Sequence, residues 1–222
     1  MSSLLHINTA TEHAYVCLSE NKRVLGYKEC LLQNQHSSFL HDAIRELLKA
    51  SGKKTSNLDA VSVINGPGSY TGLRVGLSAA KGICYALDLP LICISTLEWL
   101  AYPFKKNKYD LIIPMVDARR MEVFTAVYSA ELAFVSEPKA LILNDQSFEE
   151  ILPGNTTMFT GNGSGKLPDS IKLFPNCEVT ATTSTCHEHV IIALNFFRIK
   201  QFAELAYAEP FYLKPFQSSS VK

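Results

Sequence analysis

The sequence predicts an α/β protein built from two similar units, and three observations lead to this fold class. Strand-like and helix-like segments alternate through the first hundred residues, a polar and basic stretch follows at 103–109, and the alternation then starts again. With 222 residues, 47% of them hydrophobic, the chain can bury a substantial core, which excludes a disordered or fibrous protein. Lysine plus arginine and aspartate plus glutamate number 21 each, so the chain lacks the basic excess of proteins that grip nucleic acid unaided.

The first unit begins with three strand-like segments, at 4–8, 14–18 and 23–32. A polar turn at 20–22 separates the last two, so we expect an antiparallel meander. Apolar residues at three- and four-residue spacing then predict a helix from about Ser37 to Ala50. The remaining expected elements are a strand at 60–64, a helix at 70–87, a strand at 91–94 and a short helix through Trp99, capped by Ser95 or Thr96.

The second unit repeats this pattern, with strands expected at 111–116, 122–128, 134–143 and 158–160. Asp145 can cap a short helix through Leu152, and Thr185 with Glu188 forms a capping box before a helix to about Ala203. We therefore expect one subdomain at 1–104, a second at 109–209, and a tail at 210–222 that returns to the first.

The cysteines and the apolar segments indicate a cytoplasmic chain. None of the six cysteines forms a CxxC pair and most lie in apolar runs, which favours buried free thiols in a reducing compartment over disulfides. The first residues lack the basic and apolar regions of a signal peptide. The longest apolar runs fall short of the ~20 residues that cross a bilayer, so no membrane association is expected.

The strongest local signal is the glycine-rich segment 66–76, which lies between a predicted strand and a predicted helix. Backbone N–H groups at such a helix start can hold an anion. Thr71 stands where the dinucleotide fingerprint needs a small residue, and no Gly-Lys-Ser/Thr closes the segment as in a P-loop. The alternatives are a weak anion site and a tight structural turn, in which Arg74 would bind loop carbonyls or a nearby carboxylate. The candidate residues are Gly66, Gly68, Ser69, Tyr70, Thr71, Gly72 and Arg74.

Small residues recur every four positions in the helix after this segment, at Gly72, Gly76 and Ala80. Glycine inside a helix costs ~1 kcal/mol relative to alanine, so the row indicates that another backbone approaches closely. That backbone belongs either to the same chain or to a partner subunit, and both alternatives stay open. For a partner surface, the predicted residues are His36, Phe39, Leu40, Gly72, Gly76 and Ala80.

The sequence offers little support for catalysis or metal binding. His36 and His41 are five residues apart, whereas a two-histidine helical site needs a spacing of four. His187 and His189 start a predicted helix and point to nearly opposite sides. The segment also lacks a Gly-x-Ser-x-Gly elbow, so no catalytic residue, metal ligand or cofactor is predicted. The basic run at 105–108 is either a solvated linker or a phosphate contact.

The segment 66–76 resembles the signature of the bacterial TsaB family, also called YeaZ. Further landmarks occur in the family's order: the opening strand and turn at 4–11, the helix start at 36–37, the hairpin at 116–123, a late loop at 161–163 and a motif at 210–214. The resemblance covers nearly the whole chain and implies a duplicated actin-like fold, the two-domain ASKHA architecture with ribonuclease H-like units. It marks Asp117, Arg119, Gly161, Asn162 and Gly163 as second-domain loop residues.

The resemblance also implies a role: a non-catalytic scaffold in the machinery that forms N6-threonylcarbamoyladenosine at position 37 of tRNAs reading ANN codons. In this family the chain pairs with the catalytic paralogue TsaD, the ATPase TsaE joins them, and a homodimer is expected in isolation, with tRNA reached only through the complex. Asn8 stands where this fold commonly has an aspartate, and a neutral amide supplies no carboxylate for a magnesium-bound nucleotide. The competing classes are an actin-like small-molecule kinase, a metallopeptidase and a plain binding module.

Overall fold

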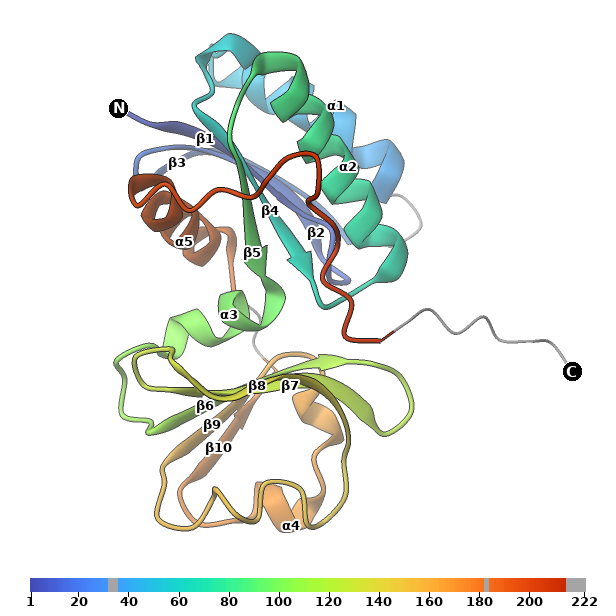
Figure 1. Ribbon diagram of the computed structural model, residues 1–222, viewed down its shortest axis with the longest axis vertical. Coiled ribbons are helices and arrows are strands. Elements are labelled where there is room, and N and C mark those ends of the chain that lie inside the picture. The colour runs from blue at the N-terminus through green and yellow to red at the C-terminus, as the bar shows by residue number, and fades with distance from the viewer. Residues whose placement is uncertain (32–35, 182–183, 215–222) are drawn as a thin grey trace, which may run out of the picture.

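The computed structural model describes residues 1–31, 36–181 and 184–214, with the side chains of 36–38 left out. Within these residues the chain forms two α/β lobes, one above the other in Figure 1, each built on a five-stranded sheet. The first sheet contains β1 (Ser3–Asn8), β2 (Ala14–Glu20), β3 (Arg23–Cys30), β4 (Ala60–Gly66) and β5 (Leu91–Ser95). Its strand order is β3-β2-β1-β4-β5; the first three strands form the predicted antiparallel meander, and β4 and β5 run parallel to β1.

The second sheet repeats the arrangement of the first. It contains β6 (Leu111–Asp117), β7 (Glu122–Ser129), β8 (Phe134–Ile142), β9 (Thr157–Thr160) and β10 (Cys177–Thr180). Its order from the other edge is β8-β7-β6-β9-β10, again a meander followed by two strands parallel to the central one. This shared order and polarity confirms the predicted fold class, two like units of the ribonuclease H-like kind.

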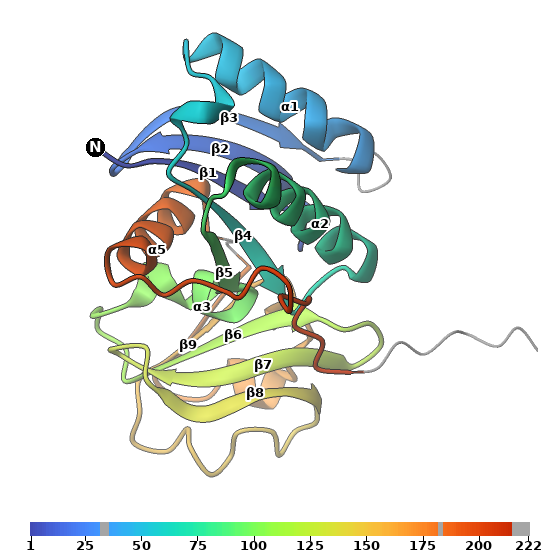
Figure 2. The same ribbon diagram turned by 45° about the horizontal axis from the view of Figure 1, so that its top comes forward.

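Helices cover both faces of the first sheet. Helices α1 (His36–Ala50) and α2 (Tyr70–Leu87) lie side by side on one face, and α5 (Cys186–Arg198) lies on the other (Figure 2). Helix α5 begins at the predicted capping box of Thr185 and Glu188. It ends before the predicted Ala203, because Lys200 takes a left-handed φ of 57° and Ala203 pairs with Leu91 of β5. Helix α5 lies within the range 109–209 that was expected to form the second subdomain, but it packs on the first sheet. The boundaries of the two subdomains remain a prediction.

Three elements of the second half differ from the predictions. The segment 145–152 forms turns instead of a helix, because Phe148 takes a φ of 67° and the Asn144 side chain accepts from the N–H of Gln146. Strand β10 and the one-turn helix α4 (Asp169–Lys172) were not predicted. Each contains four residues, too few to show an apolar period.

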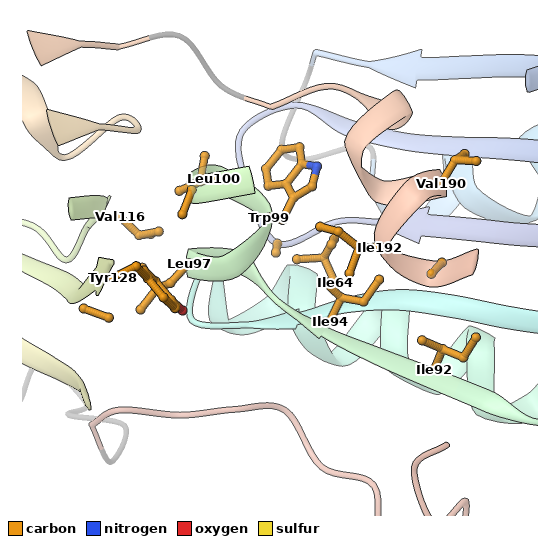
Figure 3. Close-up of a cluster of buried hydrophobic side chains, with 14 of the residues drawn as sticks. Ile64, Ile92, Ile94, Leu97, Trp99, Leu100, Val116, Tyr128, Val190 and Ile192 are labelled. Carbon is orange, nitrogen blue, oxygen red and sulfur yellow. The ribbon is translucent and has the colours of Figure 1, made fainter. Parts of the chain in front are cut away.

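The short helix α3 (Thr96–Ala101) joins the two lobes through a shared core (Figure 3). Ser95 is its N-cap, as predicted, and accepts from the N–H of Leu97. The indole N–H of Trp99 donates to the carbonyl of Thr185 at 3.0 Å, which ties α3 to the start of α5. The core around α3 takes side chains from both sheets and from α5, among them Ile64, Ile92, Ile94, Val116, Tyr128, Val190 and Ile192.

A fully buried polar network fastens α5 to the first sheet. His6 is hydrogen-bonded to Ser62 at 2.7 Å and to Ser19 at 2.8 Å, and His189 of α5 is hydrogen-bonded to Ser62 at 3.0 Å and to Tyr15 at 3.1 Å. Burial lowers the pKa of His6 to about 3. Burial, with His6 alongside, lowers the pKa of His189 well below its usual value. Both imidazoles are therefore neutral in the folded chain.

This network predicts that the chain loses stability as the pH falls below 6.5. In that range the unfolded histidines bind protons that the folded ones cannot, so the free energy of unfolding should fall by up to ~1.4 kcal/mol per pH unit for each histidine. Guanidinium unfolding at pH 7.5 and pH 5.0 measures the loss. The His189→Gln variant should show a shallower pH dependence. Equal stability of the unaltered chain at both pH values contradicts the account.

Two further features of the described chain bear on its environment. None of the six cysteines, all of which lie in the described residues, forms a disulfide. Among the helices of residues 1–31, 36–181 and 184–214, none combines the length and the apolar composition needed to span a bilayer.

Candidate functional site: glycine loop, interlobe region and helical face

The glycine-rich loop between β4 and α2 packs tightly on the turn that follows β1. The N–H of Ser69 donates to the carbonyl of Ala10 at 2.7 Å, and the Ser69 hydroxyl caps α2 by accepting from the N–H of Gly72. A Cβ atom on Gly68 would lie 2.3 Å from the Ala10 oxygen, so a side chain has no room there. The N–H donors of Ser69 and Gly72 at this helix start are thus used inside the chain, which favours the structural turn over an anion site.

The row of small residues in α2 faces the chain's own β1. A Cβ atom on Gly72 would lie 2.0 Å from the Thr9 carbonyl oxygen, and one on Gly76 would lie 2.3 Å from the Thr9 hydroxyl. That hydroxyl donates to the Gly72 carbonyl at 2.6 Å, and Ala80 is fully buried. The approaching backbone is therefore intramolecular, and the prediction that Gly72, Gly76 and Ala80 contact a partner is wrong because the sheet covers them.

The predicted interface residues of α1 differ in how accessible they are to a partner. Leu40 is fully buried in the core under α1, so it too is inaccessible to a partner. Phe39 is half-buried at the edge of this core. The side chain of His36 lies outside the described residues.

Arg74 binds tyrosines rather than the predicted carbonyls or carboxylate. Its guanidinium lies over the ring of Tyr70, 4.0 Å from the centroid, and its Nε donates to the hydroxyl of Tyr212 at 2.9 Å. The two tyrosine rings lie 5.2 Å apart. Thr71 is exposed in the first turn of α2. Arg74 thus connects α2 to the C-terminal motif at 210–214.

That motif passes directly over the glycine loop. The N–H of Phe211 donates to the carbonyl of Asn65 at 2.7 Å, and a Cβ atom on Gly66, whose φ is +124°, would lie 2.5 Å from the Phe211 carbonyl. Lys214 then forms an ion pair with Glu122 of the second lobe at 2.6 Å. The chain after α5 therefore runs along the first lobe (Figures 1 and 2). Lys214, the last residue that the structure describes, contacts the second lobe.

The second lobe contains an equivalent glycine loop. After β9, Gly161 has a φ of +94°, and a Cβ atom there would lie 2.4 Å from the Met115 carbonyl of β6. The N–H of Gly163 donates to the same carbonyl at 3.0 Å, and Asn162 accepts from the N–H of Asp117. The loop thus packs on the end of β6 as the first glycine loop packs on the end of β1.

The ends of the two central strands lack a free carboxylate pair for a magnesium-bound nucleotide. Asn8, fully buried at the end of β1, accepts from the N–H of Ala10 at 2.9 Å. Asp117, at the end of β6, accepts from the N–H of Arg119 and forms an ion pair with Lys166 at 2.5 Å. In the part of the chain that the structure describes, no group of three or more histidine, cysteine, aspartate or glutamate side chains is arranged to hold a metal ion.

These contacts predict that ATP with Mg²⁺ binds no tighter than the millimolar range, or ~−4 kcal/mol. The N–H groups of Ser69 and Gly72 already have acceptors and the Asp117 carboxylate is already paired, so the triphosphate and its metal find few ligands. Isothermal titration of the purified chain measures this. Micromolar binding that is lost in Arg74→Ala would overturn the prediction.

The accessible face of α2 forms an apolar groove of about 650 Å³ beside α1. Its lining comes mainly from one side of α2, with His41 and Thr55 at the rim: Val75, Ser78, Ala79, Gly82, Ile83, Ala86 and Leu87. A Cβ atom on Gly82 would meet nothing within 4 Å. This face was not predicted from the sequence, although the apolar spacing of Val75, Ala79 and Ile83 is a signal for it.

The two lobes have sheets of the same strand order and matching glycine loops, and these features define a duplicated α/β protein of the actin-like class. Its fold is similar to that of YeaZ from Pseudomonas aeruginosa, with a TM-score of 0.78 and 25% identity over 96% of this chain and 100% of that one. A family model described as TsaD, tRNA N6-adenosine threonylcarbamoyltransferase, matches residues 30–139.

Several curated relatives carry the name tRNA threonylcarbamoyladenosine biosynthesis protein TsaB. The chain is 33% identical over 129 residues to the Escherichia coli (strain K12) protein and 34% identical over 127 residues to that of Bacillus subtilis (strain 168). These matches cover 58% and 57% of this chain and 55% of each relative, so the chain spans about half the length of these two relatives. A Buchnera aphidicola relative is 29% identical over 85% of this chain and 86% of its own length. The chain thus resembles the TsaB, or YeaZ, family along most of its length.

Proposed function

We propose that this chain is a cytoplasmic, non-catalytic subunit of the complex that forms N6-threonylcarbamoyladenosine at position 37 of ANN-decoding tRNAs. It acts by binding and activating a TsaD-like catalytic paralogue, and a TsaE-like ATPase joins the pair. The name shared by its curated relatives supports the pathway. The apolar groove on α1 and α2 is the structural observation that carries the scaffold role.

The groove has the properties of a protein-binding surface. Val75, Ile83 and Leu87 line it with aliphatic side chains, and burial of such area contributes ~25 cal/mol per Å². Gly82 leaves open space at the surface of α2, so a partner helix can approach the helix backbone closely. Tyr85, which is 84% exposed on the same helix, offers an aromatic anchor of the kind enriched at interfaces.

The match of the TsaD model to residues 30–139 favours a paralogue as the partner. This range contains α1 and α2, so a TsaD-like chain has an equivalent helical face. Two related faces can pack about an approximate two-fold axis, as identical faces do in a symmetric dimer. The same groove can therefore take a second copy of this chain when the paralogue is missing, so a homodimer is expected in isolation.

Activation follows from selective binding. A subunit that binds only the competent conformation of the catalytic chain raises the population of that conformation, by an amount set by its differential affinity. The chain carries 21 basic and 21 acidic residues, so tRNA is held through the complex rather than by this subunit alone.

Analytical ultracentrifugation of the chain with TsaD of the same organism tests the proposal. We expect a heteromeric species to form at micromolar concentrations and the homodimer to disappear as TsaD is added. If both proteins sediment independently at these concentrations, the proposed role is wrong.

A further inference from the structure

A second hollow, of about 640 Å³, lies between the lobes and apart from the α1–α2 groove. The ends of β4 and β5 form one side, β8 forms another, and the chain after α5 forms a third. The side chains that matter here are Ser95, Phe134, Glu137, Glu209, Phe211 and Tyr212.

Two carboxylates enter this hollow from different elements. Glu137 comes from β8, and Glu209 comes from the chain after α5; both side chains are exposed. The ion pairs among the described residues include neither of them. Two cations contact residues beside the hollow: Arg74 donates to the hydroxyl of Tyr212, and Lys214 pairs with Glu122. Arg74, Lys139 and Lys214 are not among the residues that line the hollow. The carboxylates of Glu137 and Glu209 therefore have no ion-pair partner in the part of the chain that the structure describes.

Three aromatic rings share the hollow with these carboxylates. Phe134 is 50% exposed, and Phe211 and Tyr212 are each 38% exposed. Aromatic faces attract organic cations through the ring quadrupole, and carboxylates add charge-assisted hydrogen bonds. The same carboxylates repel a nucleotide phosphate or an RNA backbone, so the lining selects a cation with an apolar stem.

A buried hydroxyl beneath the hollow lacks a partner. The Tyr128 ring stacks on Phe134 at 4.9 Å and is 2% exposed. Its hydroxyl, near Ser95, has no hydrogen-bond partner among the described residues, and Figure 3 shows this side chain beside Leu97 at the start of α3. Because this hydroxyl is inaccessible and Tyr128 is not among the lining residues, Tyr128 supports the wall that Phe134 forms and does not itself contact a bound group.

We propose that the hollow binds an arginine or lysine side chain presented by a partner protein. The cationic head lies between Glu137 and Glu209, and the aliphatic stem lies against Phe134, Phe211 and Tyr212. The volume exceeds one side chain, so it also takes the flanking peptide backbone. The hollow shares no lining residue with the α1–α2 groove, so failure of this proposal leaves the scaffold proposal standing.

The probe is a Gly-Arg-Gly tripeptide with blocked ends, titrated into the full ¹⁵N-labelled chain and followed by NMR. We expect shifts at Ser95, Phe134 and Phe211, and at least tenfold weaker binding of the matching Gly-citrulline-Gly, which has the same shape without the charge. Equal binding of the two peptides, or shifts confined to other surfaces, overturns the proposal. So does tighter binding of ATP or of a short RNA at the same residues.

Variants separate binding from folding. Glu137→Gln combined with Glu209→Gln should weaken the arginine peptide at least tenfold, whereas Glu150→Gln, at an exposed site outside the hollow, should leave its affinity unchanged. Tyr128→Phe should leave both the affinity for the peptide and the stability of the free chain unchanged, because the hydroxyl it removes lies outside the lining and has no partner among the described residues. Unchanged peptide affinity in the double glutamate variant contradicts the proposal.

Discussion

The Gly72→Ala substitution is expected to lower the free energy of unfolding by about 3 kcal/mol or more, because the new methyl group has no room. Its carbon would lie 2.0 Å from the backbone carbonyl oxygen of Thr9, and since a Cβ atom is held directly by the backbone, no side-chain rotation can relieve the clash. The helix would have to move off β1, which would also break the bond from the Thr9 hydroxyl to the Gly72 carbonyl. Guanidinium unfolding followed by circular dichroism measures the loss.

Gly82→Ala in the same helix is the matched control, and it should have the opposite sign. A Cβ atom there meets nothing within 4 Å, so alanine adds helix propensity, worth ~1 kcal/mol, without a clash. If the two alanine variants have equal stability, the orientation of α2 on the sheet is wrong.

The Gly82→Leu substitution is expected to weaken association with the catalytic subunit at least tenfold while leaving the chain folded. The leucine side chain would project into the groove between α1 and α2 and hold a partner helix away. Overpacking of a close contact costs ~1–3 kcal/mol, and 1.4 kcal/mol corresponds to a factor of ten in affinity. The Gly76→Leu variant is unsuitable for this purpose, because its clash with Thr9 would disturb the fold itself.

Gly165→Leu supplies the control for this experiment. Gly165 lies in the second lobe, and a Cβ atom there also meets nothing within 4 Å. The Gly165→Leu variant therefore adds the same side chain as Gly82→Leu, but outside the groove on α1 and α2. Its affinity for the catalytic subunit should match that of the unaltered chain. Unimpaired binding by Gly82→Leu, measured by isothermal titration, places the interface elsewhere.

The sequence predicted most of the elements because their signals are local. The meander of β1 to β3 follows from alternating strands and a polar turn, and α2 begins and ends at its predicted residues. The capping box of Thr185 and Glu188 is complete within four residues. Such features need no knowledge of distant parts of the chain.

The orientation of α2 could not be predicted in this way. Helical period shows that Gly72, Gly76 and Ala80 share one face and that Val75 and Ile83 share another, but it does not say which face turns toward the sheet. The Thr9 carbonyl decides this, and it lies 63 residues from Gly72 in the chain. The small residues therefore predicted correctly that another backbone approaches α2 closely. They did not show whether that backbone belongs to the same chain or to a partner.

The contacts of the C-terminal motif were hidden for the same reason. Arg74 and Tyr212 are 138 positions apart, and nothing near Arg74 marks a tyrosine as its partner. The bond from Phe211 to Asn65 likewise joins two segments that are far apart in the sequence. The hollow between the lobes exists only because these segments meet.

Reconstituted tRNA modification tests the scaffold role most directly. TsaD and TsaE of the same organism are combined with threonylcarbamoyl-AMP and an unmodified ANN-decoding tRNA, with and without this chain, and modified adenosine is followed by mass spectrometry. If the chain is a scaffold for TsaD, we expect modification only when the chain and TsaD are both present. The Gly82→Leu variant should give strongly reduced modification. Equal modification without the chain, or modification by the chain when TsaD is left out, would contradict the scaffold role.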